Sequence, residues 1–159
     1  MFTPAIYVAA MPMASAVMAA ILLILVWPDR VRPTGLPLLC LVASAGIWAL
    51  FYALEILTPA LAAKVLMAQF QYVGIVFVAP SWCVAVARAI GEPHLLNRRR
   101  LALMLLLPVF TLAAAFTNSY HGLLWSKTYL GDEAVPMLQM DHGPIFWLNN
   151  QYEWLLLMG

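Results

Sequence analysis

Charged residues are scarce in this sequence. Of its 159 residues, 9% are charged and 65% are apolar, and the mean hydropathy is +0.90. Soluble domains average about 25% charged and about 45–50% apolar residues, so the composition excludes an ordinary soluble domain and indicates a membrane protein. The net charge of +1, without any stripe of basic and aromatic residues, also excludes a nucleic-acid-binding protein.

Sequence signatures of enzymes are missing as well. The chain has no glycine-rich phosphate loop, no paired catalytic motif and no cluster of metal-ligating residues. We therefore expect no catalytic residue, no metal site and no cofactor in this segment. Only two cysteines occur, Cys40 and Cys83, and both are expected to be reduced packing residues rather than a structural disulfide. No Lys or Arg precedes Arg30, so the first apolar run lacks the basic start of a signal peptide and is expected to be a retained helix.

Five apolar runs account for most of the chain, at residues 5–27, 36–57, 65–87, 101–118 and 145–159. A membrane-spanning helix needs about 20 such residues. The runs are continuous and do not alternate, which favours helices over a β-barrel. The predicted fold is an all-α, polytopic transmembrane helix bundle that forms a single domain over 1–159. We expect the fifth run to be cut short by the end of the sequence.

The connections between these runs predict the orientation in the membrane. Those at 28–35 and 88–100 carry six of the eight basic residues, whereas the alternate connections carry only Lys64 and Lys127. Short loops rich in Lys and Arg stay in the cytoplasm. The N-terminus and the 117–144 segment are therefore predicted to lie outside.

Small residues mark two places where helices could approach closely. Ala43-Ser44-Ala45-Gly46 lies at mid-depth in the second run and predicts a close contact with a neighbouring helix. The first run holds small pairs four residues apart, such as Ser15 and Ala19. These could be packing positions, or they could reflect the general abundance of alanine in membrane helices.

Three polar residues lie near the outer ends of the second and third runs. Glu55 is within one turn of the end of its run, where an interfacial anchor in contact with headgroups or water is favoured over a ligand-binding group. Gln69 and Gln71 are two positions apart and cannot share a helix face. Because an unpaired amide in hydrocarbon is costly, at least one of them should face the bundle.

The fifth run is the most polar of the five. Asn149, Tyr152 and Glu153 fall at positions i, i+3 and i+4, on one face of a helix. If the helix begins near Ile145, Glu153 lies about 12 Å along it, near mid-membrane, where an ionisable residue marks a functional site by default. Gln69 or Gln71 would then be its natural partner. If the helix begins later, Glu153 would lie at the outer interface instead.

The 117–144 segment concentrates the chemistry of the chain, including two of its three histidines. Residues 125–130 and 135–140 could form a short hairpin with Gly131-Asp132 at its tip. His121 is expected to form a hydrogen bond that ties the segment over the bundle, and it shares a face with Trp125 if the fourth helix continues through both. The histidines are 21 positions apart, which disfavours a zinc site. An interfacial aromatic belt would also explain the aromatic residues here.

The order of these features resembles the N-terminal seven-transmembrane region of bacterial sensor histidine kinases. The resemblance rests on Trp48-Ala49-Leu50-Phe51-Tyr52-Ala53-Leu54-Glu55, on Gln71-Tyr72-Val73-Gly74, on the arginine-rich 88–100 connection, on Thr117-Asn118-Ser119-Tyr120-His121-Gly122-Leu123-Leu124-Trp125, and on Gly143-Pro144-Ile145-Phe146-Trp147 with Tyr152. It implies a sensory input domain in the bacterial cytoplasmic membrane, followed by a cytoplasmic kinase or other signalling module. A homodimer is compatible with it.

The sequence thus predicts a sensor that detects a small-molecule or membrane-borne signal in an outward-facing cup. The residues expected to line this cup are Asn118, His121, Trp125, Trp147, Tyr152 and Glu153, with Gln69 and Gln71 as further candidates. The alternative is a fragment of a transporter or permease, in which Glu153 with Gln69 or Gln71 would bind a solute or a proton. A structural membrane anchor without a ligand is the third possibility.

Overall fold

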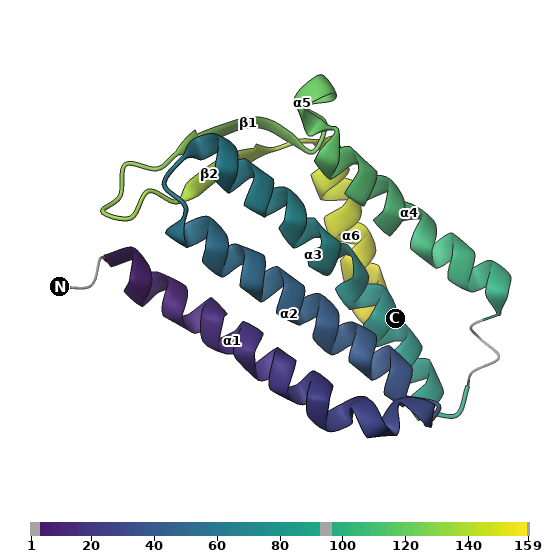
Figure 1. The fold of residues 1–159 in the computed structure, drawn as a ribbon. Coiled ribbons are helices and arrows are strands. Elements are labelled where there is room, and N and C mark those ends of the chain that lie inside the picture. Colours follow the sequence, from purple (N-terminus) through teal and green to yellow (C-terminus); the bar gives the residue numbers. More distant parts are fainter. Residues whose placement is uncertain (1–3, 93–96, 159) are drawn as a thin grey trace.

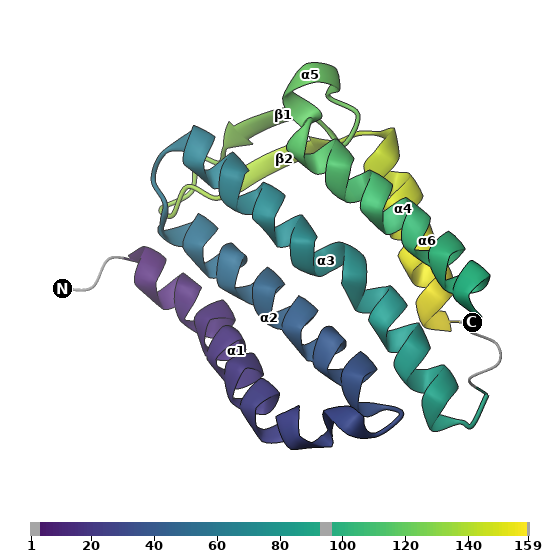
Figure 2. The same cartoon turned by 45° about the vertical axis from the view of Figure 1, so that its right-hand side comes forward.

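The computed structural model describes residues 4–92 and 97–158, and in these residues a helix bundle carries a β-hairpin across one end (Figures 1 and 2). The elements are α1 (Pro4–Val26), the 3-10 helix η1 (Trp27–Val31), α2 (Gly35–Leu57), α3 (Leu61–Ala89), α4 (Arg98–Phe116), α5 (Asn118–His121), β1 (Trp125–Leu130), β2 (Leu138–His142) and α6 (Pro144–Met158).

The predicted polytopic helix bundle is confirmed. Helices α1 to α4 are long and apolar enough to cross a membrane by length and composition. Helix α6 covers residues 145–158 of the predicted fifth run, and Gly159 lies outside the described residues. Two helix starts differ from the prediction by three residues or more. Helix α3 begins at Leu61, before the predicted start at 65. Helix α4 begins at Arg98 because the Asn97 side chain accepts a hydrogen bond from the Arg100 amide at 2.9 Å and caps the helix.

Helix α3 is at the centre of the molecule. Helices α1, α2 and α3 lie side by side, and α4 and α6 pack on the other side of α3 (Figure 1). Both strands of the hairpin also contact α3. The buried apolar core forms where α3, α4, α6 and the start of the hairpin meet. Its members are Ala68, Tyr72, Val76, Ala114, Ala115, Leu124, Trp125 and Ile145.

Small residues allow α2 to approach both of its neighbours, as the sequence predicts. A Cβ atom added at Gly74 of α3 would collide with the backbone oxygen of Ser44 in α2. Gly46 of α2 similarly faces the Cβ of Ala19 in α1. Backbones packed this closely gain van der Waals contact that larger side chains would prevent. The prediction of a close helix contact at 43–46 is confirmed, and Ala19 is a packing position.

The predicted hairpin is confirmed, with a shifted second strand. Strands β1 and β2 are antiparallel, with Tyr129 opposite Gln139 and an irregularity between Trp125 and Lys127. The second strand covers residues 138–142 instead of 135–140, because Pro136 has no backbone N–H to donate to a partner strand. The tip closes through the Gly131 amide, which donates to the Met137 carbonyl at 2.9 Å.

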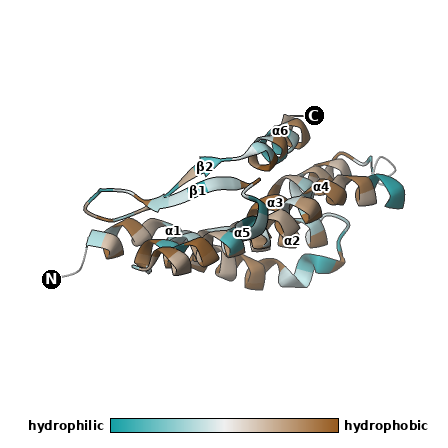
Figure 3. Ribbon diagram, turned by 90° about the horizontal axis from the view of Figure 1, so that it is seen from above, coloured by the Kyte–Doolittle hydropathy of each residue, from teal (hydrophilic) through white to brown (hydrophobic). Residues whose placement is uncertain are grey.

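The two ends of the bundle differ in chemistry. The hairpin is at one end, and the arginine-bearing ends of α3 and α4 and the η1 connection are at the other (Figure 1). Hydrophobic residues dominate the helices, whereas the hairpin and the helix ends are more hydrophilic (Figure 3). In the predicted orientation the hairpin end is outside, and we call it the outer end.

Candidate functional site

Asn118, the first residue of α5, organises the turn from α4 into the hairpin. Its Oδ1 accepts hydrogen bonds from the backbone amides of Leu124 (2.9 Å) and Trp125 (3.1 Å), and its Nδ2 donates to the Trp125 carbonyl at 2.9 Å. Leu124 and Trp125 are buried, so water cannot replace these bonds. Gly122, at φ 63°, supplies the left-handed backbone that lets the chain fold back onto Asn118.

His121 ties the same turn together, as the sequence predicts. Its Nδ1 accepts a hydrogen bond from the Leu123 amide at 3.0 Å. Its Nε2 lies 3.1 Å from the Thr117 hydroxyl, which itself donates to the Ala113 carbonyl at 2.8 Å. This pattern places the ring proton on Nε2. The prediction that His121 shares a helix face with Trp125 is wrong, because α5 ends at His121 and the chain reverses at Gly122.

A pocket of about 340 Å³ opens beside this turn, and we call it the outer pocket. Its walls come from the outer part of α3, from α5 and from the start of β1. The lining residues are Val65, Gln69, Asn118, Ser119, Tyr120, His121, Gly122, Trp125, Ser126, Lys127 and Thr128. Gln69 donates a hydrogen bond from Nε2 to the Ala115 carbonyl at 3.1 Å, so one pocket residue also connects α3 to α4.

The predicted aromatic residues separate into buried and exposed positions. Trp125 is 2% exposed and meets the Tyr72 ring edge to face, with centroids 5.4 Å apart. An interfacial aromatic belt is therefore wrong as an explanation of Trp125. Trp147 is 54% exposed and contacts the Phe146 ring. The Phe146 ring in turn stacks on the His142 ring, with centroids 3.6 Å apart. Trp147 does not line the outer pocket, and its exposure fits a belt at the membrane surface.

A second group of polar residues is buried beneath the hairpin, and we call Glu55, Lys64 and Gln71 the buried polar cluster. Gln71 Nε2 donates to Glu55 Oε2 at 2.7 Å, and Lys64 Nζ donates to the Glu55 backbone oxygen at 2.8 Å. The backbone of Leu138 in β2 interacts with the same carboxylate. Glu55 is 5% exposed and Lys64 is 2% exposed. The prediction that Glu55 is an interfacial anchor in contact with headgroups or water is wrong, since the hairpin covers it.

Helix geometry explains how Glu55 and Gln71 meet. Helices α2 and α3 run in opposite directions and are joined by the short connection at 58–60. Side chains on a helix lean toward its N-terminus. Glu55 therefore leans away from the outer end, and Gln71, deeper in the bundle, leans toward that end. The two residues lie at different depths in the bundle, and their side chains extend toward each other and meet. The cluster therefore connects α2, α3 and β2.

Glu153 is paired within its own helix. Asn149 Nδ2 donates to Glu153 Oε1 at 2.8 Å, as expected for residues that share one face. The predicted pairing of Glu153 with Gln69 or Gln71 is wrong, because Gln69 binds the Ala115 carbonyl and Gln71 binds Glu55. Helix α6 begins at Pro144, so Glu153 lies about 14 Å along it. A later start, with Glu153 at the outer interface, is therefore excluded.

Tyr152 links α6 to α4 at a similar depth. Its hydroxyl donates to the Met104 carbonyl, in the half of α4 that is remote from the hairpin. Asn149 is buried, and its Oδ1 has no hydrogen-bond partner among the described residues. Tyr152 and Glu153 are both half-buried, and neither lines the outer pocket.

The residues predicted to line one cup therefore lie at separate places in the structure. Asn118, His121, Trp125 and Gln69 meet at the outer pocket, whereas the other candidates lie elsewhere. Among residues 4–92 and 97–158, no group of three or more His, Cys, Asp or Glu side chains could hold a metal ion. Sequence reasoning missed Lys64, which it assigned to a connection. The signal that could have located it is the antiparallel pairing of α2 and α3, which places Lys64 at the level of Glu55.

Comparison with known families gives one result that covers nearly the whole chain. A family model described as the N-terminal 7TM region of histidine kinase matches residues 11–159. Comparisons with curated proteins and with solved structures found no match.

Proposed function

Because the chain belongs to the N-terminal seven-transmembrane region of histidine kinases, we propose that it detects a small polar molecule at the outer pocket and transmits the event through α3. Membership of this family makes the chain a membrane sensory region of multi-pass type, with the lipid bilayer and a cytoplasmic kinase module as its partners. Our proposal adds the site of detection, the route, and a setting in the bacterial cytoplasmic membrane. A homodimer is also compatible with this role.

The observation that carries the proposal is the position of α3. Val65 and Gln69 of α3 form one wall of the outer pocket, and the helix continues past Pro80 to Ala89. From Val65 to Ala89 the helix is about 36 Å long at 1.5 Å per residue, enough to reach from the pocket to the opposite membrane surface. A ligand that displaces Val65 or Gln69 would therefore act directly on an element that reaches the kinase side.

The chemistry of the outer pocket indicates the kind of ligand. Asn118 and His121 use their polar atoms to hold the turn, so they shape the pocket. The Lys127 side chain is exposed and forms no hydrogen bond or ion pair among the described residues, although its backbone pairs with Asp141 in the hairpin. The hydroxyl groups of Ser119 and Thr128 also line the pocket. Its volume of about 340 Å³ suits a small molecule, and its free donors favour one with an anionic or hydrogen-bond-accepting group.

The family match favours the sensor over the transporter alternative. The transporter interpretation depends on a site formed by Glu153 with Gln69 or Gln71, and these side chains have other partners. Gln71 belongs to the buried polar cluster, which joins α2 and α3 beneath the hairpin. In the proposed sensor this cluster fixes the outer end of α3 in its resting position.

Filling the outer pocket tests the proposal. Ser119 is exposed, lines the pocket and takes part in no hydrogen bond that holds the turn, so Ser119→Trp adds bulk there. We expect the variant to shift the autophosphorylation rate of the histidine kinase that carries this region by about fivefold or more, the usual range for coupled sites. The assay uses membrane vesicles and labelled ATP.

Two matched variants complete the test. Ser119→Ala removes the hydroxyl without filling the pocket, and Leu103→Trp adds the same bulk on α4, where Leu103 is 69% exposed. With no ligand added, both should leave the autophosphorylation rate within about twofold of the wild-type rate, below the roughly fivefold lower bound for coupled sites. A wild-type rate in Ser119→Trp, at wild-type abundance, would show that the outer pocket is not coupled to the kinase.

A further inference from the structure

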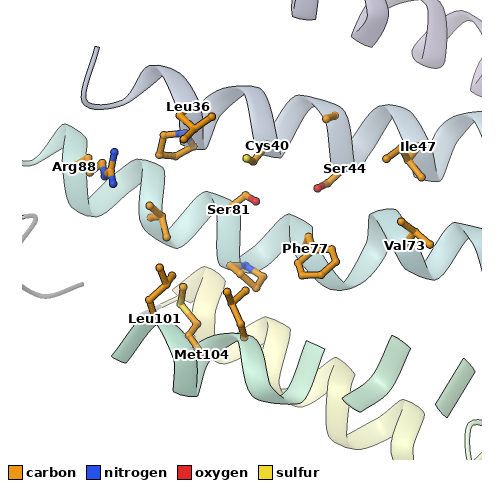
Figure 4. A pocket seen from close by; sticks show the side chains of 15 residues that line it. Leu36, Cys40, Ser44, Ile47, Val73, Phe77, Ser81, Arg88, Leu101 and Met104 are labelled. Carbon is orange, nitrogen blue, oxygen red and sulfur yellow. The ribbon is translucent and has the colours of Figure 1, made fainter. Parts of the chain in front are cut away.

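A second cavity lies at the opposite end of the bundle and is unlike the outer pocket. It is a groove of about 520 Å³ between α2, α3 and α4, and Figure 4 shows side chains from these helices converging on it. Its walls are mainly apolar and include Leu36, Ile47, Phe77, Val84, Met104 and Leu105. We call it the inner groove, because it occupies the half of the bundle remote from the hairpin.

The length of the inner groove corresponds to one leaflet of a membrane. Along α2 it runs from Leu36, at the start of the helix, to Ile47. Eleven steps of 1.5 Å give about 17 Å, and half of a hydrocarbon core about 30 Å thick is about 15 Å. A straight acyl chain that entered from the remote membrane surface would therefore match the groove in length.

A positively charged side chain lies at the end of the groove that is remote from the hairpin. Arg88, near the end of α3, is the charged residue among those that line the groove, and Figure 4 places it beside Leu36. Its Nη1 donates to the Pro33 carbonyl at 2.8 Å, which fixes the guanidinium and leaves further N–H donors for a ligand. Leu101, also in the lining, directly follows the exposed Arg98-Arg99-Arg100 of α4.

We propose that the inner groove binds one anionic glycerophospholipid of the cytoplasmic leaflet, with an acyl chain in the groove and its phosphate at Arg88. The apolar walls match the acyl chain, and the guanidinium matches a phosphate both in charge and in its planar arrangement of donors. Basic pockets between transmembrane helices on the cytoplasmic side are suited to such headgroups. The neighbouring arginines of α4 extend the positive field that favours an anionic lipid over a zwitterionic one.

Lipid titration by native mass spectrometry tests this site. The purified full chain in detergent is titrated with phosphatidylglycerol and, separately, with phosphatidylcholine of identical acyl chains. We expect tighter binding of phosphatidylglycerol. Arg88→Gln should weaken phosphatidylglycerol binding about fivefold, the effect of one basic residue near an anionic headgroup. It should weaken phosphatidylcholine binding less, because the choline cation offsets the charge of the phosphate at Arg88. Arg88→Lys keeps the charge and should retain most of the preference.

Arg32→Gln is the matched control for charge, because Arg32 lies in the connection on the same side, pairs with Asp29 at 3.1 Å and does not line the groove. It should weaken phosphatidylglycerol binding less than twofold, since a paired exposed charge contributes little. Equal affinity for the two lipids, or equal effects of Arg88→Gln and Arg32→Gln, would overturn the proposal.

Two further variants test the apolar part of the groove. Ala43→Phe narrows it from α2, and Met104→Trp narrows it from α4; circular dichroism confirms that each variant is folded. Both should lose the tightly bound lipid of either type. If a folded variant retains that lipid, the lipid binds elsewhere on the bundle. If these positions cross-link to a second copy of the chain, the groove belongs to a protein interface. Either result contradicts the proposal.

Discussion

Asn118→Ala should loosen the outer turn without unfolding the bundle. The change removes the acceptor of the Leu124 and Trp125 amides and the donor to the Trp125 carbonyl. Leu124 and Trp125 are 0% and 2% exposed, so both amides lose their partner out of reach of water. Each unsatisfied buried group costs about 1–3 kcal/mol, and two such amides lower the free energy of local opening by about 3 kcal/mol. At 1.4 kcal/mol per factor of ten, the turn should open roughly a hundredfold more often.

Hydrogen exchange of neighbouring amides measures this opening. The Gly143 amide donates to the Leu124 carbonyl at 2.8 Å, and the Ile145 amide donates to the Leu123 carbonyl at 3.1 Å. These bonds persist in the variant, so faster exchange at Gly143 and Ile145 reports opening of the turn. Ser119→Ala, one residue away, should exchange at the wild-type rate. If exchange at Gly143 rises by less than about threefold, below the roughly fivefold effect of a single unsatisfied amide at about 1 kcal/mol, then Asn118 does not hold the turn.

Three other changes test the remaining polar groups and the topology. Gln71→Leu leaves the buried Glu55 carboxylate without its amide donor and should lower the free energy of unfolding in a detergent titration by about 2 kcal/mol. The double variant with Glu55→Leu should recover much of that loss, and simple addition of two losses would argue against a direct pair. Glu153→Gln keeps an oxygen that can accept the hydrogen bond from Asn149 within α6 and should preserve signalling. Glu153→Leu should abolish signalling. Wild-type signalling from the leucine variant would exclude a functional role for Glu153. In a chain without its native cysteines, a cysteine at Ser126 should react with an impermeant thiol reagent in intact cells and one at Thr34 should not, and the reverse pattern would invert the proposed topology.

The helical framework could be predicted because it depends on local composition. Each long apolar run forms a helix within a few residues of the predicted bounds, since hydrocarbon leaves a backbone few alternatives. The hairpin was also predictable, because Gly131-Asp132 marks its tip. The position of β2 was harder to predict, since it depends on where Pro136 ends the tip and on pairing with β1.

The interior of the site was harder to predict because its contacts are non-local. Glu55 lies near the end of an apolar run, where a carboxylate usually meets water. It is buried by Lys64 and Gln71 of α3 and by Leu138 of the hairpin, which comes more than 80 residues later in the chain. Gln69 and Gln71 do lie on opposite faces of α3, as their spacing requires. Their partners, Ala115 and Glu55, depend on which helix packs on each face, and one sequence does not specify that.

The backbone bonds from Gly143 to Leu124 and from Ile145 to Leu123 make the outer segment a closed insertion. These bonds hold the two ends of the segment next to each other beside the bundle. The packing of the helices therefore does not depend on the length of the chain between those ends. Lengthening a surface loop costs only about 0.6 kcal/mol for each doubling. An epitope or a small reporter domain inserted at the exposed tip residues 132–134 should therefore leave the membrane bundle intact, which makes the hairpin tip the natural point for attaching a probe to this sensor in living cells.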